Sequence, residues 1–157
     1  MSEEAIQTFK RLNRDYSVVF FGLIACLLLS SIYVSNIGAV LGYDAVLFTY
    51  LNAVSYALTA LFLVFAYAYP QAVIKKVQAG DEFTEKIAIY RTAISRRMLL
   101  IGLAGLATCV FFVLTADTNL MVVLAIILIF LILARPTPFK TAADLSLSDE
   151  EKRSLMR

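Results

Sequence analysis

Four stretches without a charged residue dominate the hydropathy pattern of the chain. These uncharged stretches cover residues 16–43, 45–74, 98–116 and 118–134. An α-helix rises about 1.5 Å per residue, so about 20 residues cross the roughly 30 Å hydrocarbon layer of a membrane. The pattern therefore predicts an all-α polytopic membrane protein. Its four transmembrane helices are expected over residues 17–42, 44–69, 98–116 and 119–135.

The composition supports this prediction. Hydrophobic residues make up 61% of the 157 residues, whereas an ordinary soluble domain holds about 45–50% apolar residues. A soluble chain of this length could not cover four such stretches with polar residues. A set of buried core helices in a soluble protein is therefore excluded as the explanation.

The positive charges are confined to three segments. All 14 lysines and arginines lie before residue 15, between residues 75 and 97, or after residue 134, while the two other connections contain only Asp44 and Asp117. Loops rich in lysine and arginine stay in the cytoplasm. We therefore expect two helical hairpins with both termini in the cytoplasm, and a multi-pass protein of a bacterial inner membrane.

The N-terminal residues 1–16 predict an amphipathic lead helix. Apolar residues recur at helical spacing and face one side: Ala5, Ile6, Phe9, Leu12 and Tyr16. Such a helix either lies on the membrane or continues into the first span. We interpret the apolar run that follows this segment as an uncleaved first span, because that run is longer than the core of a secretory signal.

Six basic residues stand where the predicted helices meet the membrane surface. They are expected to contact anionic lipid headgroups. These residues are Lys10, Arg11, Arg14, Arg96, Arg97 and Arg135.

The central connection, residues 70–97, predicts a helical hairpin that extends into the cytoplasm. The second helix is expected to continue through Gln78 and to end at Gly80, because glycine favours the helix C-terminus. Thr84 is expected to cap a helix that runs unbroken into the third span. The two spans would then form one pair that projects beyond the membrane.

Residues 136–157 predict a cytoplasmic tail with one short helix. Pro136 and Pro138 disfavour a continued helix, so the fourth span is expected to end before them. Ser148 and Glu151 have the spacing of a capping box, in which each residue caps the other at the start of a helix. The expected short helix therefore starts at Ser148.

Residues able to carry out chemistry are scarce. Histidine is absent, and Cys26 and Cys109 are single residues deep in two different spans. No carboxylate or basic side chain lies inside a span, although transporters coupled to protons or ions usually hold such a group there. We therefore expect no catalytic residue, no metal ligand and no cofactor, and the chain is not expected to be an enzyme.

Uncharged polar residues form one stripe on the second span, with further polar residues on the first. The stripe consists of Asn52, Ser55, Tyr56 and Thr59, and the first span adds Ser31 and Asn36. Such groups either form hydrogen bonds between helices or line a cavity for a small uncharged or lipid-like ligand. Both interpretations are kept at this point.

The third span has a face of small residues, Gly102, Gly105 and Thr108. Small residues let another helix approach closely, and that helix belongs either to this chain or to a neighbour. The fourth span is apolar on every face, so it is expected to contact lipid or the apolar surface of a partner.

Two functions fit these features. The first is a structural or accessory subunit that binds other membrane proteins through its transmembrane helices. The second is a homo-oligomeric transporter or channel that uses the polar stripe. The expected partners are membrane lipids together with a membrane protein or further copies of the chain. Nucleic acid is not expected, because the basic residues stay at the membrane edge and form no separate module.

Overall fold

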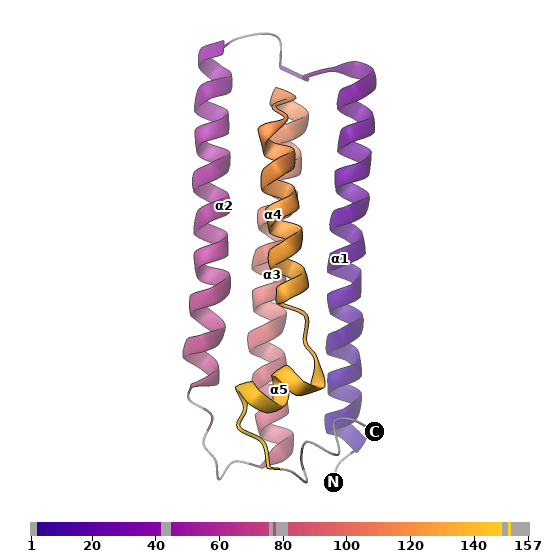
Figure 1. Ribbon diagram of the computed structural model, residues 1–157, viewed down its shortest axis with the longest axis vertical. Helices are drawn as coiled ribbons and strands as arrows, with labels where there is room; N and C mark the ends of the chain where they lie inside the picture. The colour runs from indigo at the N-terminus through magenta and orange to yellow at the C-terminus, as the bar shows by residue number, and fades with distance from the viewer. Residues whose placement is uncertain (1–2, 42–44, 76, 78–81, 149–150, 152–157) are drawn as a thin grey trace.

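The structure is a computed structural model that describes residues 3–41, 45–75, 77, 82–148 and 151. The described residues form α-helices and no strand, so the all-α prediction is confirmed. Four helices run along the length of the molecule and the fifth lies across one end, as Figure 1 shows. The helices are α1 Glu3–Ile37, α2 Ala45–Ile74, α3 Phe83–Thr115, α4 Asn119–Leu133 and α5 Pro138–Asp144.

Helix α3 is the centre of the bundle. It packs against α1, α2 and α4, whereas α1 and α2 have little direct contact. Figure 1 shows α1 and α2 on opposite sides, with α3 and α4 between them. The first two helices are therefore joined in sequence but have little direct contact, because α3 lies between them and contacts both.

Three helices are long and apolar enough to cross a membrane: α1, α2 and α3. Helix α4 has 15 residues, which corresponds to about 22 Å and is shorter than the roughly 30 Å hydrocarbon layer. By length and composition alone, α4 and α5 reach the size of a fourth span only together, and they meet at 76°. The structure thus holds three to four candidate spans.

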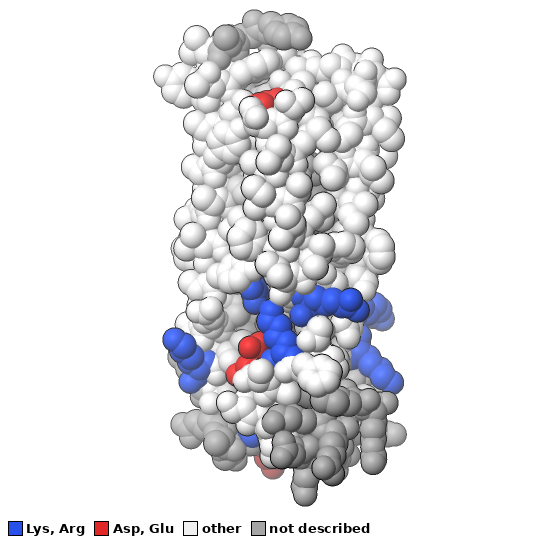
Figure 2. All heavy atoms as spheres, viewed as in Figure 1, with Lys and Arg blue, Asp and Glu red and all other residues white. Residues whose placement is uncertain are grey.

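The basic residues gather at one end of the bundle. Figure 2 shows lysines and arginines in its lower part, while the long upper part of the visible face is almost free of charge. We call this end the basic end. It is formed by the start of α1, the end of α2, the start of α3, and α5.

At the opposite end, α1 stops at Ile37, earlier than the expected residue 42. Gly38 follows with φ 84°, a backbone conformation that favours glycine and ends helices. The backbone N–H groups of Val40 and Leu41 donate to the carbonyls of Val113 and Leu114 over 3.2 and 3.3 Å. The connection is therefore held on α3, and the predicted turn residue Asp44 lies outside the described residues.

Helix α2 ends at Ile74, four residues before the expected Gln78. Val77 donates its backbone N–H to the carbonyl of Ile74 over 3.0 Å, a tight turn that closes the helix. Helix α3 begins at Phe83 and runs unbroken to Thr115, with Glu82 at the N-cap position. Thr84 lies inside the helix and is not the cap, and Gly80 lies outside the described residues.

The packed core of the bundle reaches into the basic end. Leu12 of α1 and Tyr90 and Ile94 of α3 are each 1% exposed and belong to one cluster. The lead segment of α1 therefore covers the start of α3. The sequence had instead predicted that an extended α2 packs there. The reason is that α1 continues unbroken through its amphipathic part, whereas α2 stops one turn after Pro70.

The C-terminal segment packs on the same core. Helix α5 was not expected; it begins where Thr137 accepts a hydrogen bond from the backbone N–H of Lys140 over 3.2 Å, with Pro138 in the first turn. The predicted capping pair is present, since Ser148 N donates to Glu151 Oε2 over 2.8 Å. The helix expected after Ser148 lies largely outside the described residues.

Candidate functional sites

The outer part of the polar stripe on α2 is bound to the start of the connection after α3. Asn52 Nδ2 donates to Asp117 Oδ2 over 2.6 Å, and Thr115 Oγ1 lies 3.3 Å from Asn52 Oδ1. Asp117 Oδ1 also accepts the backbone N–H of Asn119 over 2.9 Å. These contacts tie α2 to the turn that joins α3 and α4.

The inner part of the stripe contacts α3 as well. The hydroxyl oxygens of Thr59 and Thr108 lie 2.9 Å apart in a buried position. Thr108 donates its only hydroxyl proton to the carbonyl of Ala104 over 2.8 Å, so Thr59 is the donor to Thr108. Ser55 is 1% exposed, and its hydroxyl has no hydrogen-bond partner.

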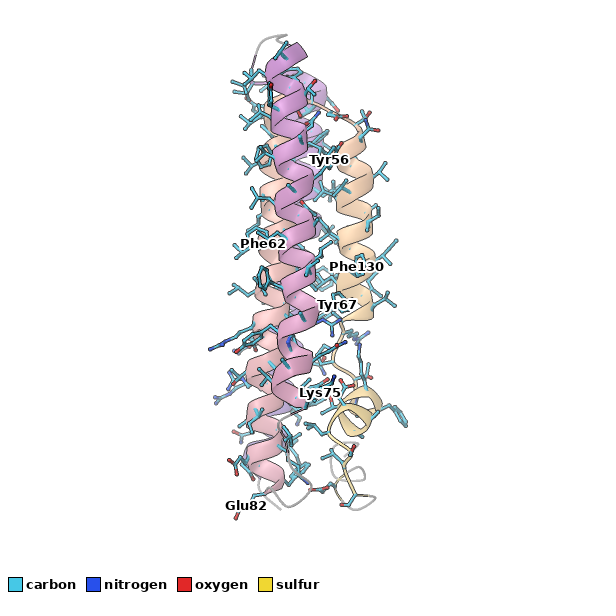
Figure 3. The ribbon with its side chains drawn as sticks, turned by 90° about the vertical axis from the view of Figure 1, so that its left-hand side faces the viewer. Tyr56, Phe62, Tyr67, Lys75, Glu82 and Phe130 are labelled. Atoms are coloured by element: carbon cyan, nitrogen blue, oxygen red, sulfur yellow. The ribbon has the colours of Figure 1, made fainter. Side chains whose placement is uncertain are left out.

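The two polar candidates of α1 lie apart from the stripe, and the remaining stripe residue is Tyr56. Ser31 and Asn36 of α1 donate to the carbonyls of Leu27 and Ile32 in their own helix, each over 2.7 Å. Tyr56 is 39% exposed on α2, and its hydroxyl is within hydrogen-bond reach of Asp117; Figure 3 shows its position in the upper half of the helix. The structure thus brings the four residues of the stripe to α3 and the turn after it, and leaves Ser31 and Asn36 apart.

The small residues of α3 serve contacts within the chain. A Cβ atom on Gly105 would lie 2.6 Å from Leu23 Cδ2, and one on Gly102 would lie 3.3 Å from Val19 Cγ1. Both contacts are with α1, whereas Thr108 faces α2. The predicted close approach is therefore made by two helices of this chain.

A groove runs along the boundary between α1 and α3. It consists of two adjoining cavities of about 430 and 230 Å³, which share Cys26 and Leu106. Its walls come from residues between Val19 and Tyr33 on α1 and between Met98 and Leu114 on α3. We call it the α1–α3 groove. It is open to the surface, since Leu29 and Val110 in its walls are 67% and 57% exposed.

Two arginines of α3 rest on tyrosines of α2 near the basic end. The guanidinium carbon of Arg97 lies 4.0 Å from the ring centre of Tyr67, and that of Arg96 lies 5.1 Å from the ring centre of Tyr69. Cations over aromatic faces attract each other. Tyr67 also meets the edge of Phe130 of α4, and Figure 3 shows this pair between α2 and α4.

The other predicted headgroup contacts are exposed. Lys10, Arg11 and Arg14 line the start of α1, where Arg14 Nε lies 3.9 Å from Asp15 Oδ1. Arg135 is exposed directly after α4. These side chains are free to reach toward headgroups, unlike Arg97, which is half-buried.

A hollow of about 390 Å³ at the basic end was not predicted. We call it the cationic hollow, and its polar walls are Tyr67, Gln71, Lys75, Arg97, Lys140 and Asp144. The sequence does not reveal this hollow, because α5, which supplies the last two residues, falls in the segment predicted as an irregular tail. The Thr-Pro pair at residues 137 and 138 is the signal that could have revealed this helix.

Lys140 is partly buried in the hollow, close to the positive charge of Arg97. Its Nζ donates to the carbonyl of Leu133 over 2.6 Å. Burial lowers the pKa of Lys140, the positive charge of Arg97 lowers it further, and Asp144 offsets part of this effect. The local positive charge is therefore only partly balanced.

An ion pair fixes the tail to α3. Lys86 Nζ lies 3.5 Å from Glu151 Oε1, and the Lys86 side chain is 5% exposed. Burial raises the pKa of Glu151, but the hydrogen bonds from Ser148 and the charge of Lys86 outweigh it, so the pKa lies below its ordinary value of 4.5. Tyr90 adds a hydrogen bond to Asp144 over 3.3 Å.

In the part of the chain that the structure describes, no three residues of the metal-binding types gather in one place. Comparisons with protein families, with curated proteins and with solved structures give no match for this chain. The function is therefore inferred from the chain's own contacts.

Proposed function

We propose that the protein is a structural or accessory subunit that binds another membrane protein through its transmembrane helices. It lies in a bacterial inner membrane with the basic end in the cytoplasm, and α4 forms a short fourth span. Positive residues at one end of every long helix support this orientation, because such residues resist transfer across the membrane.

The short α4 is compatible with a fourth span. Arg135 directly follows it and is exposed, so its aliphatic stem can lie along the apolar zone while its guanidinium reaches the headgroups. A span shorter than the membrane is also accommodated by local thinning of the bilayer. The α4–α5 bend then places α5 at the cytoplasmic surface.

The α1–α3 groove is the observation that carries the proposal. Exposed apolar residues alone are expected wherever a helix faces lipid, but a concave groove between two helices leaves packing incomplete. Between Val19 and Tyr33 the groove extends about 21 Å along α1, which is about four helical turns. A transmembrane helix of another protein fits such a shape, and close packing is what drives helix association in lipid.

The transporter alternative is supported less well. Asn52 and Thr59 of the polar stripe form hydrogen bonds with α3 or the turn that follows it. The groove and the cationic hollow are lined by other residues. Within the stripe, Ser55 has a buried hydroxyl without a hydrogen-bond partner, and it is the observation that favours this second candidate.

Filling the groove tests the proposal. Nothing lies within 4 Å of a Cβ atom on Gly22, so Gly22→Leu adds bulk to the groove without a clash inside the chain. The matched control is Ala60→Leu, at an exposed position of α2. Each variant is purified from native membranes in mild detergent, and its mass is measured under native conditions.

We expect the unaltered chain and Ala60→Leu to carry one other membrane protein at a fixed ratio. Gly22→Leu should lose at least half of it, while its own folding is unchanged. Purification of the unaltered chain alone, or as a symmetric oligomer, contradicts the accessory role.

The orientation is tested separately, in a variant whose two native cysteines are replaced by alanine. Glu85→Cys at the basic end and Val40→Cys at the opposite end are both exposed positions. A thiol reagent that cannot cross membranes should label Val40→Cys in intact cells and Glu85→Cys only after the membrane is opened. The reverse pattern rules out the proposed orientation.

A further inference from the structure

The cationic hollow joins three elements that are distant in the sequence. Lys75 comes from the end of α2, Arg97 from α3, and Lys140 with Asp144 from α5. Figure 3 shows Lys75 at the lower end of α2, on the side of α5. The positive charges of the hollow exceed its one negative charge.

The four charged groups are not equally available to a ligand. Asp144 already accepts the hydroxyl of Tyr90 over 3.3 Å, which partly satisfies its carboxylate. Lys140 Nζ spends one of its three protons on the carbonyl of Leu133. Lys75 is exposed at the rim. Two ammonium groups thus keep donors that a ligand can use.

Arg97 is held in place, and one of its N–H donors has no hydrogen-bond partner. Its guanidinium lies 4.0 Å from the ring centre of Tyr67, and that ring is fixed in turn against Phe130. Its Nε is buried and has no hydrogen-bond partner. A buried donor without an acceptor is costly, so an acceptor that enters the hollow gains from this arrangement.

The position of the hollow narrows the choice of ligand. It lies along the last two turns of α2, from Tyr67 to Lys75, and tyrosines gather at the membrane interface. This is the depth at which lipid headgroups lie. A volume of about 390 Å³ falls within the roughly 300–1,000 Å³ common for small-molecule sites.

We propose that the cationic hollow binds a phosphate group, held by Lys75, Arg97 and Lys140. The phosphate oxygens accept hydrogen bonds from the two ammonium groups and from the guanidinium, which suits both donor types. The source is the headgroup of an anionic phospholipid or a water-soluble phosphate compound. The site is separate from the α1–α3 groove, so Gly22→Leu leaves it unchanged.

The test uses the full-length protein in detergent, titrated with phosphatidylglycerol or with phosphatidylcholine. Bound lipid is counted by native mass spectrometry. Lys75→Gln combined with Lys140→Gln removes two charges from the hollow, and Lys10→Gln combined with Arg14→Gln removes two charges from the exposed face of α1. The two double variants change the net charge equally, so they separate a local site from general attraction.

We expect the unaltered protein to bind one phosphatidylglycerol molecule more tightly than phosphatidylcholine. The hollow variant should bind it roughly tenfold more weakly, because each lysine near the surface contributes to such binding. The α1 variant should change the affinity less than about threefold. Equal losses in the two double variants, or equal affinity for the two lipids, overturn the proposal.

Asp144→Asn gives a result that misfolding cannot imitate. Removal of the one carboxylate in the hollow should tighten phosphatidylglycerol binding by roughly threefold or more, and unchanged or weaker binding counts against the site. Inorganic phosphate identifies the source. If millimolar phosphate leaves the lipid bound, the ligand is the lipid headgroup; if it displaces the lipid and binds with the same dependence on Lys140, the ligand is a soluble phosphate compound.

Discussion

The basic end and the apolar length of the bundle are packed in different ways. At the basic end Leu12, Ile87 and Ile94 are at most 2% exposed, and they form a continuous core with α5 and the segment after it. Along the apolar length, α1 and α3 meet at Gly102 and Gly105 but leave the α1–α3 groove beside them. The basic end is closed by its own side chains. Along the apolar length, α3 and α4 bury residues such as Ile101 and Ile127, but the boundary between α1 and α3 stays open.

This difference has a physical reason. Water drives apolar side chains together, so the part of the chain outside the membrane folds like a small soluble domain. Lipid provides no such force between helices, and helices in lipid associate through close packing and hydrogen bonds. The apolar length can therefore keep a groove that a partner fills.

The largest expected effect comes from a truncation in the core of the basic end. Ile94→Ala should lower the free energy of unfolding by about 2–5 kcal/mol, because it leaves a cavity in a packed core. Leu99→Ala, five residues along the same helix and 60% exposed before substitution, should change it by about 0.5 kcal/mol or less. Equilibrium unfolding in detergent measures both values, and equal losses would remove the contrast between the two regions.

The next effect lies where α1 and α3 touch. Gly105→Leu should lower the free energy of unfolding by about 1–3 kcal/mol, because its Cβ would lie 2.6 Å from Leu23 Cδ2. Gly22→Leu, on the facing helix, should be tolerated because its Cβ meets nothing within 4 Å. The same unfolding measurement applies, and a Gly22→Leu loss as large as that of Gly105→Leu shows that the groove is closed.

A smaller effect depends on pH. The pKa of Glu151 is lowered in the folded protein, so its stabilising contribution, about 1 kcal/mol, is present above pH 4.5. It is lost as the pH falls through the lowered pKa. The protection of residues 141–148 against hydrogen exchange, measured relative to the intrinsic exchange rate at each pH, should therefore fall at low pH. In Glu151→Gln this loss of protection should be weaker, and an unchanged pH dependence would argue against the ion pair with Lys86.

The smallest effect concerns the hydrogen bond between α2 and α3. A double-mutant cycle with Thr59→Val and Thr108→Val should give a coupling of about 0.6 kcal/mol, the usual value in membrane helices. Unfolding of the two single variants and the double variant supplies the cycle. A coupling of zero would mean that the two hydroxyls do not stabilise the pair, which would favour a ligand-binding role for the stripe.

The sequence predicted the helical nature of the chain well, because apolar length and charge position are local signals. It missed the end of α2 at Ile74 and the whole of α5. Both depend on packing at the basic end, where the lead segment of α1 and the tail compete for the surface of α3. The periodicity of one segment does not reveal which of the segments packs on α3.

The sequence predicted the candidate sites in part, as it did the fold. Asn52, Ser55 and Thr59 were predicted to lie on one face of a helix, because their spacing in the sequence matches the helical repeat. The partner of Gly102 and Gly105 could not be predicted, since small residues permit close approach without selecting the neighbour. The cationic hollow was missed because Lys75, Arg97 and Lys140 come together only through the position of α5.

Cross-linking inside the membrane tests the central claim most directly. A photoreactive residue replaces Val110 in the wall of the groove or, as a control, Val64, which is 64% exposed on α2. After irradiation of intact native membranes, position 110 should be joined to one other membrane protein, and position 64 mainly to lipid. If position 110 yields only lipid adducts, or if both positions give the same products, no partner occupies the α1–α3 groove and the account is contradicted.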